Sequence, residues 1–194
     1  MRTTTQSLVA ALLVTILVSS NASAQDPKAQ ALEPKTKLEA FQAKSGAVII
    51  RGFSEVGSVQ GQLSTSVQVE CKEFTDASSG KKEYGITVTV KSSSRFEKES
   101  TSFIDYDEID SLVKGIDYIE KIDKSATKLA AFQADYKTKG DLIVSTFSNS
   151  QGGVEAAVQS GRFGGTSAYL TLPDLEQFKK LIVKAKMMLD EIKK

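Results

Sequence analysis

Two arginine–phenylalanine pairs are the residues of this sequence best suited to bind a ligand. Arg95–Phe96 and Arg162–Phe163 each precede a small polar turn, a short apolar segment and a helix start. If the two arginines lined one groove, they would offer bidentate contacts to a carboxylate or a phosphate. In the alternative interpretation, the phenylalanines pack at a strand edge and the arginines pair with local acids such as Glu97. These two pairs are our candidate ligand site.

The densest group of charges is acidic and surrounds the start of the first long predicted helix. Carboxylates can bind calcium or act as acid and base, but their spacing here does not match a calcium-binding loop. Acids in the first turn of a helix are also stabilised by the helix dipole. We therefore expect capping and a solvated face, and we assign no catalytic or metal-binding residue. The acids are Asp105, Asp107, Glu108, Asp110 and Asp117.

Other chemistry is restricted by what the sequence lacks. It contains no histidine, which excludes Ser-His-Asp and Cys-His catalysis and haem bound through histidine. Cys71 is the only cysteine, so no intramolecular disulfide can form, and we expect a buried thiol. The glycine-rich segment 160–165 lies between two predicted strands rather than before a helix, which favours a turn over a phosphate-binding loop. We expect no cofactor.

The N-terminus has the pattern of a secretory signal. Arg2 precedes an apolar core at 8–18, and the small residues 22–24 follow, so residues 1–24 are predicted to be a signal peptide cleaved after Ala24. The mature chain is then expected in the bacterial periplasm or outside the cell, without a transmembrane segment. Residues 25–35 form a polar, flexible lead. Removal of Arg2 changes the formal charge from +1 to 0, and a neutral chain lacks the basic footprint of a nucleic-acid-binding protein.

The rest of the chain has the pattern of a duplication. TKLEAFQA at 36–43 and TKLAAFQA at 127–134 agree at seven of eight positions, which together with the Arg-Phe pairs predicts two repeats, 36–126 and 127–194. The first repeat contains about 24 extra residues, which could form a hairpin or a loop.

Each repeat is predicted to contain about four strands followed by one helix. Residues 47–53 form an apolar run typical of a buried strand, whereas 67–74 and 84–90 alternate apolar and polar residues as an antiparallel hairpin does. In both helices, apolar residues recur at spacings of three and four. Asp105 with Glu108, and Thr171 with Asp174, resemble capping boxes. The further predicted strands are 103–105, 129–136, 141–147, 153–159 and 167–171.

These elements predict an α+β protein. We expect two antiparallel four-stranded units, each followed by a helix, to pack with internal pseudo-two-fold symmetry into a single domain over 36–194. One such unit alone would make a small core, so each helix is expected to cover apolar surface near the junction of the two repeats.

This element order resembles that of Whirly-type proteins, whose best-known members bind single-stranded nucleic acid. The resemblance implies a doubled sheet-and-helix fold, but no motif transfers residue by residue. An exported neutral chain without clustered basic and aromatic residues departs from that activity. We therefore expect a non-enzymatic exported module that binds a protein, a polymer or a small ligand through its sheet face or the groove between repeats. The alternatives are a hydrolase-like enzyme that uses carboxylates at 105–110, and a single-stranded nucleic-acid binder.

Overall fold

The computed structural model describes residues 33–93, 97–162 and 164–194. The predicted signal peptide and most of the polar lead lie outside the described residues, as do Arg95, Phe96 and Phe163. Within the described residues no helix is long and apolar enough to cross a membrane.

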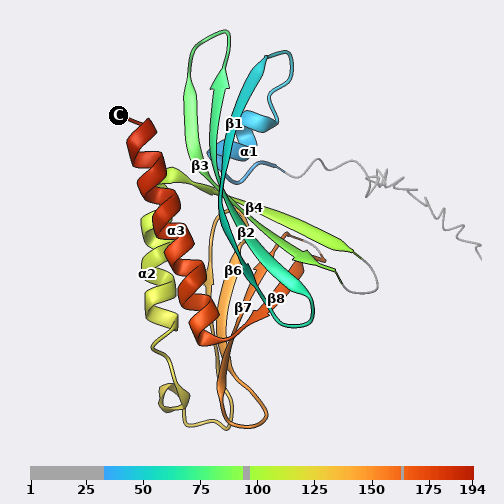
Figure 1. Cartoon of the computed structure of the whole chain (residues 1–194), viewed down its shortest axis with the longest axis vertical. Helices are drawn as coiled ribbons and strands as arrows, with labels where there is room; N and C mark the ends of the chain where they lie inside the picture. Colours follow the sequence, from blue (N-terminus) through green and yellow to red (C-terminus); the bar gives the residue numbers. More distant parts are fainter. Residues whose placement is uncertain (1–32, 94–96, 163) are drawn as a thin grey trace, which may run out of the picture. The chain divides into compact units, whose positions relative to one another are not determined.

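Two antiparallel four-stranded sheets confirm the predicted α+β class (Figure 1). In each sheet the strands lie in sequence order, as consecutive hairpins require. Sheet A contains β1 (Ile49–Gln60), β2 (Thr65–Asp76), β3 (Lys82–Ser92) and β4 (Lys98–Asp105). Sheet B contains β5 (Gln133–Lys137), β6 (Ile143–Ser148), β7 (Val154–Ser160) and β8 (Thr166–Leu170). The predicted first repeat, 36–126, is the longer one mainly because sheet A has longer strands than sheet B.

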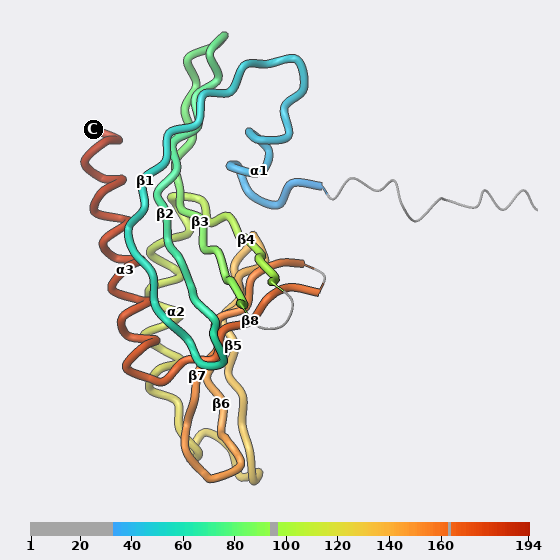
Figure 2. The backbone as a smooth tube through the Cα atoms, turned by 45° about the vertical axis from the view of Figure 1, so that its right-hand side comes forward, coloured from blue at the N-terminus to red at the C-terminus, as the bar shows by residue number. Residues whose placement is uncertain are grey.

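The helices contact both sheets. The chain begins with α1 (Lys37–Gln42), whereas α2 (Ile109–Ile119) follows β4 and α3 (Leu172–Ile192) follows β8. Short 3-10 turns lie at Tyr106–Glu108 and Lys124–Ala126. Helix α2 packs on β5 and β6 of sheet B, whereas α3 packs chiefly on β1 and β2 of sheet A and also contacts β7 and β8. Figures 1 and 2 show α2 and α3 side by side.

Alternating apolar residues explain how sheet A faces the core. Val67, Val69 and Cys71 of β2 and the neighbouring Ile86 and Val88 of β3 are buried on one face, because successive side chains of a strand point to opposite sides. The buried stripes of α2 and α3 cover this face and that of sheet B in one cluster. The second face of sheet A is therefore free for other contacts.

Two local predictions were wrong. The apolar run at 47–53 was predicted to be buried, but β1 is an edge strand whose residues 50–55 are all exposed. The matching octapeptides differ in structure: the first forms α1, whereas the second is irregular up to its last two residues, which begin β5. A capping box at Thr36 and Glu39 stabilises only the first copy, because the second has alanine at the glutamate position.

The predicted helix caps have different outcomes. The capping box of Thr171 and Asp174 is confirmed. Asp105 does not cap the turn that it precedes. Its carboxylate instead accepts the backbone N–H groups of Lys37 at 2.9 Å and Leu38 at 3.1 Å, in the first turn of α1. Unsatisfied N–H groups at any helix start attract a carboxylate. Asp105 therefore caps α1, which lies far from it in the sequence, and not the helical turn that directly follows it.

Candidate functional site

Arg162, one of the predicted ligand residues, is held by acids of this chain. Its Nε donates to Asp141 at 2.9 Å and its Nη2 donates to Glu39 at 3.2 Å. Lys35 Nζ also contacts Asp141, at 2.7 Å. The guanidinium thus links α1 to the β5–β6 turn of sheet B. These contacts favour a structural, ion-paired role for Arg162 over a ligand-binding role. The acids involved are not the local Glu97. Arg95, the other arginine of the predicted shared groove, lies outside the described residues.

The predicted acidic cluster does not converge on a cavity. Asp107 pairs with Lys37 at 2.8 Å and Asp117 with Lys179 at 2.8 Å. Glu108 is buried and accepts the backbone N–H of Lys139 at 2.8 Å, and its burial raises the pKa of the carboxyl. Across the described ranges no group of three or more acidic or cysteine side chains is arranged to hold a metal ion. These acids therefore connect separate elements.

Cys71 has the properties of a core residue. Its side chain is buried on the inner face of sheet A, and Sγ donates to the carbonyl of Ala185 at 3.5 Å. Burial raises the pKa of the thiol to about 11. The reactive thiolate is therefore scarce at neutral pH.

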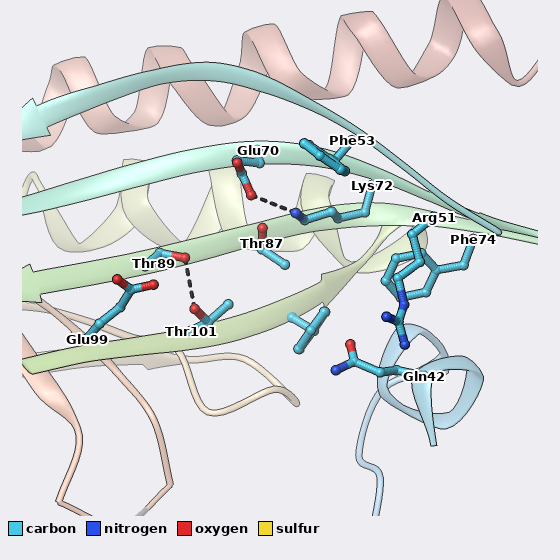
Figure 3. Close-up of a pocket in the computed structure, with 11 residues that line it drawn as sticks. Gln42, Arg51, Phe53, Glu70, Lys72, Phe74, Thr87, Thr89, Glu99 and Thr101 are labelled. Atoms are coloured by element: carbon cyan, nitrogen blue, oxygen red, sulfur yellow. Dashed lines mark hydrogen bonds and ion pairs between the residues drawn. The ribbon is translucent and has the colours of Figure 1, made fainter. Parts of the chain in front are cut away.

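The best candidate site is a hollow on the outer face of sheet A, which we call the sheet A pocket. Its volume is about 350 Å³, and all four strands and α1 contribute to it (Figure 3). Register brings these side chains together: Arg51 lies opposite Phe74, Glu70 opposite Thr87, and Thr89 opposite Thr101. The lining residues are Gln42, Arg51, Phe53, Glu70, Lys72, Phe74, Thr87, Thr89, Glu99, Thr101 and Phe103.

Helix α1 closes one end of this pocket. Leu38 and Phe41 of α1 form a small apolar cluster with Phe74, against which Phe103 packs. A side chain at Gly85 would collide with Leu38 and with the backbone of β4, so glycine is needed for α1 to lie this close to the sheet. The contacts of Asp105 and Arg162 described above hold the same helix in place. By fixing the position of α1, these hydrogen bonds and ion pairs determine the shape of the pocket at that end.

The pocket combines aromatic rings with balanced charges. Lys72 Nζ pairs with Glu70 at 2.6 Å and lies 5.0 Å from the ring centre of Phe53. The guanidinium of Arg51 lies 5.9 Å from the ring centre of Phe74. Arg51 and Lys72 are balanced by Glu70 and Glu99, so the lining has no formal net charge. Phe53 is 72% exposed at the rim.

Thr87 at the floor of the pocket has an unusual hydroxyl. The residue is only 2% exposed, and Oγ1 has no hydrogen-bond partner among the described residues. Its neighbour Thr89, by contrast, shares a hydrogen bond of 2.9 Å with Thr101. A buried polar atom without a partner costs free energy unless something satisfies it. Because Oγ1 itself is closed off from solvent, a molecule bound in the pocket satisfies it only if the side chains around Thr87 shift on binding.

None of the pocket residues was predicted as a site residue. The alternation of Gln68, Glu70 and Lys72 correctly marked a face turned away from the core, but a solvated strand face has the same pattern. Arg51 and Phe53 lay in the run expected to be buried. The only available sequence signal was the alternation of the basic Arg51 with the aromatic Phe53 along one predicted strand.

Comparison with known proteins adds no family assignment to this geometry. Searches with this chain found no matching protein-family model, curated protein or solved structure.

Proposed function

We propose that the chain is a non-enzymatic binding module whose ligand occupies the sheet A pocket, and that this ligand is an uncharged saccharide. The observation that carries the proposal is the buried, unpartnered hydroxyl of Thr87 in a hollow rimmed by Phe53. Ligand sites typically combine apolar walls with a few placed polar groups.

The chemistry of the lining favours an uncharged, hydroxyl-rich ligand. A sugar ring has an apolar face that can lie on Phe53 or Phe103, and hydroxyls that can both donate to and accept from Thr87. The paired charges of the lining disfavour a polyanion, because Glu70 and Glu99 would repel phosphates. This argues against the single-stranded nucleic-acid alternative. The hydrolase alternative loses support because Asp105, Asp107 and Glu108 are each engaged with another element.

The proposal includes export. We infer that residues 1–24 act as a signal peptide with cleavage after Ala24, so that the module works in the periplasm or outside the cell. The n-region cation, apolar core and small-residue ending of the segment support this inference.

We also infer that the two halves of the fold are related by a pseudo-two-fold axis. The shared order of four strands and a helix supports it, as does the packing of each long helix on the sheet of the other half. Ser100 of β4 and Thr166 of β8, near the starts of corresponding strands, approach to 3.1 Å between their hydroxyls. Such a contact is expected close to an axis.

Substituting Phe53 tests the proposed site. Affinity electrophoresis of the mature chain in gels containing starch, xylan, β-glucan or mannan should show retardation in at least one gel. Phe53→Ala should weaken the apparent affinity by up to about tenfold and reduce the retardation accordingly, since aromatic contacts contribute about 0.5–1.5 kcal/mol. Leu129→Ala is the matched control, because Leu129 is equally exposed but lies outside the pocket.

The experiment separates the alternatives. Equal migration in all four gels would contradict the saccharide class. Retardation that Phe53→Ala leaves unchanged would place the binding elsewhere. A labelled single-stranded oligonucleotide, titrated at low salt, should not bind, and binding would favour the nucleic-acid alternative.

A further inference from the structure

Strand β1 presents a long open edge. It pairs with β2 on one side, and no other strand of sheet A lies beyond it. Residues 50–55 are all exposed, including Ile50 at 58% and Phe53. Natural edge strands are usually protected by charged side chains, above all lysine, by proline, by a bulge or by a covering element. Ile49–Gln60 contains neither lysine nor proline, its two charges Arg51 and Glu55 have opposite signs, and its bulge comes only after Glu55. The edge is therefore suited to pairing with another strand.

The hydrogen-bond pattern shows which backbone groups face outward. Ala77 N–H donates to the Val48 carbonyl at 3.0 Å, which makes these two residues a hydrogen-bonded pair between β1 and β2. Hydrogen-bonded and non-hydrogen-bonded pairs alternate along an antiparallel ladder. Before the bulge at Glu55/Gly57, the N–H and C=O groups of Arg51, Phe53 and Glu55 therefore point away from β2.

The side chains of these same residues are self-complementary. Three alternate residues of β1 point to the outer face of the sheet: the cation Arg51, the aromatic Phe53 and the anion Glu55. If β1 pairs antiparallel with β1 of a second copy so that the two Phe53 residues face each other, each Arg51 lies opposite Glu55 of the second copy. Directly opposed residues project to the same face and interact. Shifting this register by two residues loses both charge pairs.

Both charges lack ion-pair partners within one chain. In the described part of the chain neither Arg51 nor Glu55 takes part in an ion pair, and Glu55 lies directly opposite Glu70 of β2. Like charges across a ladder are destabilising, so a cation delivered to the open side of Glu55 would relieve this repulsion. The end of helix α3 comes near β1, since Ile192 lines a hollow together with Gly52, Phe53 and Ser54, but residues 50–55 all remain exposed. The contacts of α3 with β1 include Leu181 near Gly57 and Lys184 Nζ on the carbonyl of Val56, at 3.2 Å.

We propose that two copies of this chain associate through antiparallel β1–β1 pairing centred on Phe53. The pairing joins two sheets A into one eight-stranded sheet, with both outer faces on the same side. The two sheet A pockets then lie on either side of the paired Phe53 rings, so the dimer presents two adjacent sites to one extended ligand. Association itself does not depend on the proposed saccharide.

Charge reversal tests this pairing without any ligand. Sedimentation velocity of the mature chain at low salt should show a reversible dimer. Arg51→Glu and Glu55→Arg should each weaken self-association by at least about tenfold, because two attractive pairs per dimer become repulsive. An equimolar mixture of the two variants should restore dimers, since both charge pairs of the mixed dimer then join one glutamate to one arginine. The double variant should also dimerise.

Each outcome decides the proposal. Rescue by mixing requires that both variants are folded and fixes the antiparallel register. A monomeric wild-type chain at its highest soluble concentration would overturn the proposal. So would single variants that self-associate like the wild type, or a mixture that stays monomeric. Sedimentation needs no saccharide, and Thr87→Val changes the pocket without changing β1, so a failed dimer and a failed saccharide site give different results.

Discussion

Replacing Phe178 by alanine should lower the free energy of unfolding by about 3–5 kcal/mol. Phe178 lies on α3, is fully buried, and belongs to a core cluster to which both sheets and both long helices contribute. The substitution removes the transfer free energy of the ring and leaves a cavity that the packed neighbours can fill only in part. Urea denaturation followed by far-UV circular dichroism measures the loss.

Met187→Ala on the same helix is the matched control. Met187 is exposed, so its truncation should change the free energy of unfolding by no more than about 0.5 kcal/mol. If Phe178→Ala cost as little as the control, α3 could not be packed against the sheets as described.

Asp141→Asn should lower the free energy of unfolding by about 2–3 kcal/mol at neutral pH. The Asp141 side chain is 5% exposed and contacts Arg162, Lys35 and Lys137. Without the Asp141 charge, the largely buried guanidinium of Arg162 keeps only Glu39 as an anionic partner among the described residues. Leaving a buried charge partly unpaired lowers the free energy of unfolding. The exposure of both lysines keeps the effect below that of a fully buried pair. Asparagine tolerates the left-handed backbone at this position, where φ is 63°.

The effect of Asp141→Asn should depend on pH. Burial alone would raise the pKa of the Asp141 carboxyl, but the neighbouring Lys35 and Lys137 outweigh it and hold this pKa below its usual value. A lowered pKa gives stabilisation that is complete above the unfolded value of about 3.9 and is lost as the pH falls through the folded value. The difference between wild type and variant should therefore narrow in acid.

Asp107→Asn is the control for this network. Asp107 also pairs with α1, through Lys37, but both side chains are more than half exposed. The loss should stay within about 1 kcal/mol. Equal losses for the two variants would mean that the Asp141 network contributes no more than a surface ion pair.

The regular elements were largely predictable because their signals are local. The spacing of Ile109, Leu112 and Ile116 predicts the buried face of α2, and alternation in 67–74 and 84–90 predicts the β2–β3 hairpin. Burial of β1 was mispredicted because an apolar run cannot distinguish a central strand from an edge strand. That distinction depends on which strands lie beside it.

The site was much harder to predict, because its contacts are non-local. Arg162 was predicted to be a ligand residue in a turn, whereas its guanidinium pairs with Glu39 and Asp141, which lie far away in the sequence. The hollow on sheet A arises where α1 folds back over Gly85. The unpartnered state of Thr87 follows from that packing, and no sequence pattern marks it.

The most direct test of the account is a comparison of Thr87→Val with the wild-type chain. Thr87→Val should have opposite effects on stability and binding, because valine keeps the shape of the side chain but removes the unpartnered hydroxyl. Stability should stay equal or rise by up to about 1 kcal/mol. By contrast, Thr89→Val breaks the hydrogen bond to Thr101 and should lower stability by about 1 kcal/mol.

The deciding measurement is isothermal titration calorimetry with the soluble hexasaccharide of whichever polysaccharide retards the wild-type chain. Thr87→Val should bind this hexasaccharide about tenfold more weakly than the wild type, as expected for the loss of one buried hydrogen bond. An unchanged affinity would contradict the claim that the Thr87 hydroxyl is held for a ligand.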